Sequence, residues 1–84
     1  MWVCVKAKSF ERDITLIGTA DTKEEIFDLM YDDMCKEYVT EHWLNKAIES
    51  GRADFDTENP SGWAIMDNGE DPLIVDVTWK CFWI

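Results

Sequence analysis

Apolar and polar side chains alternate with a period of two near both ends of this chain. Four such segments occur, at residues 2–9, 13–18, 63–67 and 73–84. This period is typical of β-strands, because successive side chains of a strand point to opposite faces. The polar pair Glu11–Arg12 separates the first two segments, and Asn68–Gly69, whose residues tolerate positive φ, separates the last two. The pattern therefore predicts two β-hairpins, one at each end of the chain.

Between the hairpins the apolar period changes to that of a helix. Ile26, Met30 and Met34 recur on one face. Asp21 or Thr22 is suitable as the N-cap, and in either case a glutamate follows three residues later as in a capping box. The spacing predicts a helix that ends near residues 36–38.

A second helix is expected to begin at Thr40 as its N-cap. Val39 would pack against Leu44 as a hydrophobic staple, and Gly51 would supply the left-handed residue after the helix. One bent helix over residues 21–50 is left open as the alternative, because no Pro or Gly interrupts that stretch.

These elements give the order β-β-α-α-β-β in one domain spanning residues 1–84. The expected fold is α+β, a four-stranded antiparallel sheet of order 2-1-4-3 with the helices on one face. The first and last strands are apolar on both faces, which suits central positions. Residues 52–62, rich in Asp, Thr, Asn, Pro and Gly, are expected to form a loop.

The open face of this sheet is a candidate interface. If Val3 and Val5 face the helices, the opposite face carries Trp2, Cys4, Phe82 and Ile84. Soluble monomers seldom expose a large apolar patch. We expect either a homodimer through these four residues or a cover formed by the loop 52–62.

Charge is the strongest compositional signal. The chain has 84 residues and a formal net charge of −10. Such a charge opposes direct binding to nucleic acid or an anionic membrane, and it favours basic protein partners. No apolar run approaches the ~20 residues needed to span a bilayer, and the first residues do not resemble a signal peptide. We therefore expect a cytoplasmic protein.

The acidic residues concentrate between Asp21 and Glu41, where eight carboxylates face two lysines. The helix dipole favours those in the first turn. It disfavours Asp32, Asp33 and Glu37 near the helix end, and a broken local rule is often a sign of function. A solvated face is the alternative reading. The predicted partner-binding residues are Glu24, Asp28, Asp32, Asp33, Glu37 and Glu41.

Catalysis and metal binding have little support in the sequence. His42 is the single histidine, and no nucleophile motif or glycine-rich phosphate loop is present. The acidic stretch from Asp54 lacks the Gly and Glu of an EF-hand at its sixth and twelfth positions. Three widely spaced cysteines are expected as buried thiols, with a ligand role for Cys4 or Cys81 as a weaker alternative. We expect no enzyme, no cofactor and no metal.

Two functions remain. The first is a non-enzymatic acidic binding module, an inhibitor that docks a basic, nucleic-acid-binding surface of another protein. Its size and charge are similar to those of acidic inhibitors from phages and mobile elements. The alternative is a structural or assembly protein that homodimerises through the apolar sheet face.

Overall fold

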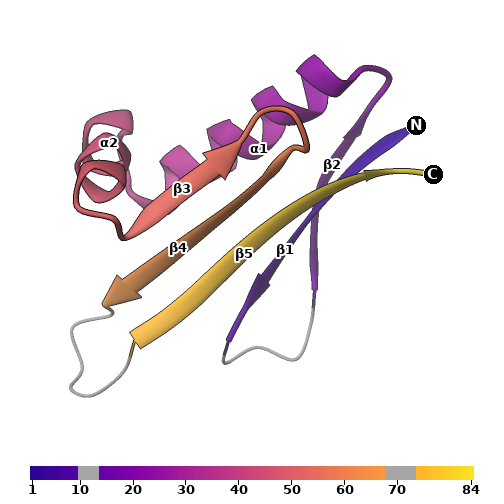
Figure 1. The fold of residues 1–84 in the computed structure, drawn as a ribbon. Helices are drawn as coiled ribbons and strands as arrows, with labels where there is room; N and C mark the ends of the chain where they lie inside the picture. The colour runs from indigo at the N-terminus through magenta and orange to yellow at the C-terminus, as the bar shows by residue number, and fades with distance from the viewer. Residues whose placement is uncertain (10–13, 68–73) are drawn as a thin grey trace.

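The computed structural model describes residues 1–9, 14–67 and 74–84. Two helices pack on one face of an antiparallel sheet that contains five strands among these residues (Figure 1). The elements in chain order are β1 (Trp2–Lys8), β2 (Thr15–Ala20), α1 (Lys23–Glu37), α2 (Glu41–Glu49), β3 (Ala53–Asp56), β4 (Ser61–Asp67) and β5 (Ile74–Trp83). The α+β class predicted from the sequence is confirmed.

The strands are ordered β2-β1-β5-β4-β3, and every neighbouring pair is antiparallel. The predicted order 2-1-4-3 corresponds to the first four of these strands, and β1 and β5 are central as expected. The connection at Glu11–Arg12 and the turn at Asn68–Gly69 lie outside the described residues.

The expectation of a loop over residues 52–62 is wrong, because β3 forms within it as an extra edge strand. Ala53 lies opposite Ala64 and Phe55 lies opposite Gly62. Phe55 also packs against Phe27 of α1, with ring centroids 5.5 Å apart. The packing of Ala53 and Phe55 outweighs the poor strand propensity of Asp54 and Asp56.

The helical region contains two helices. Thr22 caps α1 by accepting a hydrogen bond from Glu25 N at 3.2 Å, and Thr40 caps α2 by accepting one from Trp43 N at 3.3 Å. Gly51 has φ of 77° after α2, as predicted. The predicted staple is wrong, because Val39 is 85% exposed and does not pack onto the core.

The predicted facing of β1 is also wrong. Cys4 lies directly opposite Cys81 of β5, and both are buried under α1. Trp2 is on the same helix-covered side and stacks edge-on against Trp83 at 5.9 Å. Val3 therefore faces the open side. Alternation alone could not decide the facing, because both sides of β1 are apolar near its start.

The core lies between α1, α2 and the central strands, and Trp79 is its largest fully buried side chain. Small residues on β4 allow the helices to approach the sheet. A Cβ added at Gly62 would lie 2.7 Å from Met34 Sδ. The position is therefore restricted to glycine by close packing and not by backbone conformation.

Candidate functional site

Three carboxylates form a row on the outer surface of α1. Glu24, Asp28 and Asp32 follow one another at i,i+4 spacing, and all three are exposed. Asp32 pairs with Lys36 at 3.2 Å, but both side chains are more than two-thirds exposed, so the pair is weak. The row therefore stays negative.

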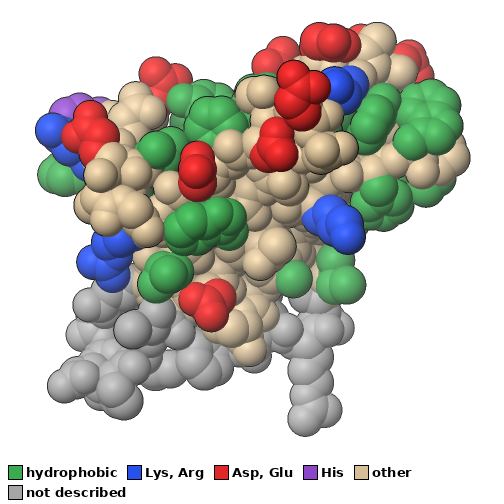
Figure 2. All heavy atoms as spheres, viewed as in Figure 1, with side chains coloured by type: hydrophobic (Ala, Val, Ile, Leu, Met, Phe, Trp, Pro, Cys, Tyr) green, Lys and Arg blue, Asp and Glu red, His purple; other side chains and the backbone are tan. Residues whose placement is uncertain are grey.

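The connection between β3 and β4 extends this negative surface. Glu58 is exposed there, whereas Asp54 and Asp56 belong to β3, alternate with the inward residues Ala53 and Phe55, and point to the open face of the sheet. Lys23 at the start of α1 donates a hydrogen bond to the Glu58 carbonyl oxygen at 2.9 Å and so holds the connection against the helix. Figure 2 shows Asp and Glu side chains along the upper edge of the molecule, where α1 and this connection lie in Figure 1. We call the four carboxylates on this side of the molecule the acidic surface, which consists of Glu24, Asp28, Asp32 and Glu58.

Two of the predicted partner-binding residues point inward. Lys6 Nζ of β1 lies 2.9 Å from Asp33 Oδ2 and 2.7 Å from Glu37 Oε1, and Lys8 Nζ lies 3.1 Å from Glu37 Oε1. Trp79 Nε1 donates to Asp33 Oδ2 at 2.8 Å. The carboxylate side chains are only 19% and 17% exposed. The inference that these charges lack compensation near the helix end is therefore wrong, because lysines of the neighbouring strand supply it.

The pKa values agree with a tightly paired network. Burial opposes ionisation of Glu37, but hydrogen bonds from Lys6 and Lys8 outweigh it and lower the pKa of the carboxyl group. Burial likewise opposes the charge on Lys6, yet the hydrogen bonds with Glu37 and Asp33 raise its pKa. The network thus joins α1 to β1 as charged groups at neutral pH.

Glu41 lies apart from the row. It is the exposed first residue of α2, where the helix dipole favours a negative charge. Burial is the main cause that raises the pKa of the Cys35 thiol, and the charge of Glu41 adds to it. The position of Glu41 is therefore explained by the helix dipole at the start of α2.

The open face of the sheet exposes apolar side chains from several strands. Of the predicted interface residues, Phe82 and Ile84 lie there, whereas Trp2 and Cys4 lie under the helices. Trp63 and Lys80 are also exposed on this face. Figure 2 shows hydrophobic side chains in separate groups with charged and polar atoms between them. The apolar surface is therefore interrupted.

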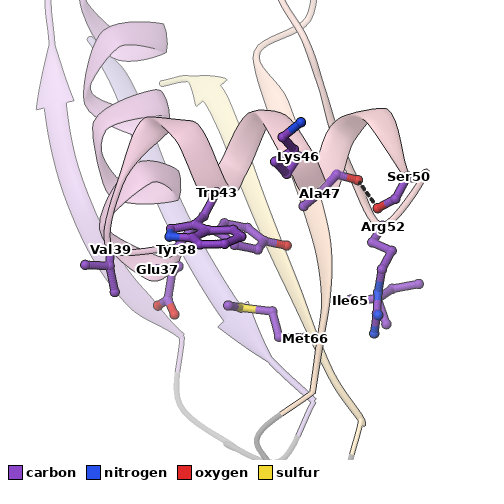
Figure 3. Close-up of a pocket in the computed structure, with 10 residues that line it drawn as sticks. All are labelled: Glu37, Tyr38, Val39, Trp43, Lys46, Ala47, Ser50, Arg52, Ile65 and Met66. Carbon is purple, nitrogen blue, oxygen red and sulfur yellow. Dashed lines mark hydrogen bonds between the residues drawn. The ribbon is translucent and has the colours of Figure 1, made fainter.

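A third surface feature is a pocket of about 450 Å³ at the junction of the two helices (Figure 3). Tyr38 and Trp43 line one part of it, and Arg52 and Ile65 line another. Tyr38 Oη is buried and has no hydrogen-bond partner among the described residues. Burial raises the pKa of this phenol. The sequence reasoning missed this pocket, and the exposed Trp43 beside the helix junction was the available signal.

The described residues contain no group of three or more His, Cys, Asp and Glu side chains that could hold a metal ion. His42 lies on α2 against Trp43, with ring centroids 5.4 Å apart. In the same part of the chain, neither helix is long and apolar enough to cross a membrane.

Comparison with protein-family models, curated proteins and solved structures finds no match to this chain. The functional argument therefore rests on the geometry of the acidic surface, the open face and the pocket.

Proposed function

We propose that this protein is a non-enzymatic binding module whose acidic surface docks onto a basic surface of another protein. One observation carries the proposal. The row Glu24, Asp28 and Asp32 is exposed, and Glu58 on the β3–β4 connection lies beside its first two members. Like charges at i,i+4 spacing destabilise a helix by about 0.2–0.5 kcal/mol per pair. A binding role would explain why the helix retains these destabilising like-charge pairs.

A nucleic-acid-binding surface is the best-matched class of partner. Duplex DNA carries one negative charge per about 1.7 Å of axis, and an α-helix repeats its i,i+4 positions every ~6 Å. The helical row alone is sparser than DNA, and Glu58 on the connection adds one further carboxylate beside it. A protein that occupies such a surface would inhibit its partner by excluding nucleic acid.

The experiment compares two variants of equal charge. Glu24→Gln/Asp28→Asn removes two charges of the row, whereas Glu49→Gln/Asp76→Asn removes two exposed charges elsewhere. Each protein captures partners from an extract, and each captured protein is then tested in a gel-shift competition with duplex DNA. We expect the wild type and the control to displace DNA from a basic partner, and the row variant to do so at least ten times less well.

Salt provides a second readout. The Debye length falls from about 10 Å at 0.1 M salt to about 3 Å at 1 M, so binding through the acidic surface should be lost at high salt. Equal competition by the row variant and the control, or binding that is insensitive to salt, would contradict the proposal.

A second function, self-assembly through the open face, is supported by the exposure of Trp63, Phe82 and Ile84. Sedimentation at rising concentration tests it directly. Self-association that Phe82→Gln weakens, and that the surface control Trp43→Gln leaves unchanged, would support it. A wild-type protein that stays monomeric at millimolar concentration would exclude it.

A further inference from the structure

Three buried sulfur-containing residues lie in the core where α1 covers the two central strands. Cys4 of β1 and Met30 of α1 are fully buried, and Cys81 of β5 is 9% exposed. The Cys81 thiol donates a hydrogen bond to Met30 Sδ at 3.8 Å. The proposed acidic surface does not use any of these groups.

The register of the sheet brings the two thiols together. Cys4 lies directly opposite Cys81. Hydrogen bonds join Ile84 N to the Met1 carbonyl oxygen and Ser9 N to the Asp76 carbonyl oxygen, both at 2.9 Å. Counting along the ladder from either bond makes the cysteines a non-hydrogen-bonded pair, with Cα atoms about 4.5 Å apart. Side chains approach most closely at such positions.

Each thiol affects the ionisation of the other. The hydrogen bond with Cys81 is the largest cause that raises the pKa of the Cys4 thiol, and burial adds to it. The negative charge of Asp33 also raises the pKa of the Cys4 thiol, and the positive charge of Lys6 has a smaller effect in the opposite direction. The cross-strand register therefore makes the two thiols neighbours in the core.

We propose that Cys4, Cys81 and Met30 form a binding site for a single Cu(I) ion. Two thiolates and a thioether are soft ligands, which favour Cu(I), zinc and iron–sulfur clusters. If copper–sulfur bonds are about as long as zinc–thiolate bonds, about 2.3 Å, two sulfurs on one metal lie about 3.8–4.0 Å apart for tetrahedral or trigonal angles. The observed 3.8 Å between Cys81 Sγ and Met30 Sδ fits this range. A structural zinc site would need four ligands, and three are gathered here.

The charge and proton balance of binding is simple. Cu(I) replaces the protons of both thiols, so two protons leave to solvent, two copper–thiolate bonds form and no electron is transferred. The resulting bis-thiolate site carries a net charge of −1.

The test uses Cu(I) itself, added anaerobically to the reduced protein in competition with a chromogenic Cu(I) chelator. We expect one equivalent per chain, with release of two protons and a near-ultraviolet thiolate-to-copper absorption. Cys81→Ser should weaken the affinity at least 100-fold, and Met30→Leu about tenfold. The matched controls are Cys35→Ser, which removes the third thiol, and Met34→Leu, which alters an equally buried methionine one turn away. Both should bind as the wild type does.

X-ray absorption of the wild-type complex makes the test independent of how the variants fold. Three sulfur neighbours at about 2.3 Å are expected. A wild-type protein that leaves all copper with the chelator would overturn the proposal. So would a nitrogen or oxygen shell, or an equal loss of binding in Cys35→Ser.

Discussion

Val39 has φ of 71°, which is rare for a β-branched residue. It lies between the two helices, is 85% exposed and makes no packing contact that explains the conformation. A left-handed residue other than glycine is disfavoured by roughly 1–2 kcal/mol. Val39→Gly should therefore raise the free energy of unfolding by about 0.5–1 kcal/mol, since glycine's greater unfolded-state entropy offsets part of the relief.

Urea denaturation measures this change as a higher midpoint at constant slope. The opposite substitution serves as the control. Gly51 also has positive φ, and nothing lies within 4 Å of an added Cβ there. Gly51→Ala should destabilise through the backbone alone, by about 1 kcal/mol. A destabilised Val39→Gly protein would show that Val39 contributes contacts that outweigh its strain.

Glu37 makes the stability of the fold depend on acid. Its folded pKa lies below the ordinary 4.5, so its contribution is present above that pH and is lost as the pH falls through the folded value. Glu37→Gln should lower the free energy of unfolding by about 1–3 kcal/mol at pH 7, as expected for a hydrogen bond to a charged group. The decline of stability below pH 4.5 should also become shallower.

The raised pKa of Lys6 makes the stability depend on pH in the opposite direction. Its contribution is full below 10.5 and is lost as the pH rises through the higher folded value. Glu49→Gln is the control for Glu37, because Glu49 pairs with Lys46 only at the exposed surface, at 3.7 Å. If the two variants show the same pH profile, the network of Glu37 is not a stabilising one.

At the scale of elements, α1 can pack closely against β4 because Gly62 has no side chain. The added Cβ of Gly62→Ala would meet Met34 Sδ at 2.7 Å and Cε at 3.0 Å. The end of Met34 can move, but it is buried in a packed core, so we expect a loss of about 1–3 kcal/mol. In a Met34→Ala background the same substitution should cost much less, because the space is then free.

A double-mutant cycle of the four proteins, measured by denaturation, isolates this coupling. Equal cost of Gly62→Ala in both backgrounds would place the restriction elsewhere, for example in the 3.6 Å approach to the Asp54 carbonyl oxygen.

The elements that the sequence could predict are those with long periodic patterns. The strands of both hairpins and the helix around Ile26 and Met30 have enough repeats to identify type and order. β3 has only four residues, and Asp54 and Asp56 are typical of loops, so its two inward residues were too few to indicate a strand. The single signal was that Ala53 and Phe55 alternate with those aspartates.

The candidate site was predictable in part for a different reason. Exposure of Glu24 and Asp28 follows from the helical period alone. The inward direction of Asp33 and Glu37 depends on Lys6, which is distant in sequence and belongs to a strand whose facing the alternation did not determine. Long-range pairing thus decided which carboxylates are free for a partner.

At the scale of the whole molecule, pairing leaves the exposed surface strongly negative. Lys6 and Lys8 face inward against carboxylates, so they do little to neutralise the outer charges. The molecule measures 41 × 28 × 18 Å, so many of its charges lie within two Debye lengths at physiological salt, where one length is about 8 Å. The net charge of −10 therefore destabilises the folded state through self-repulsion.

Asp28→Lys tests whether the acidic surface is kept at the expense of stability. It turns two like-charge neighbours, Glu24 and Asp32, into opposite pairs, and should stabilise the protein by about 1 kcal/mol at low salt. The gain should shrink as added salt screens both the repulsion in the wild type and the attraction in the variant. Asp76→Lys makes the same change in net charge on the open face and serves as the control.

If the acidic surface is the binding site, Asp28→Lys should lose the partner while Asp76→Lys retains most of the affinity. A variant that is more stable and still binds fully would show that the row is only a solvated face. Its destabilising charge would then have no role in binding.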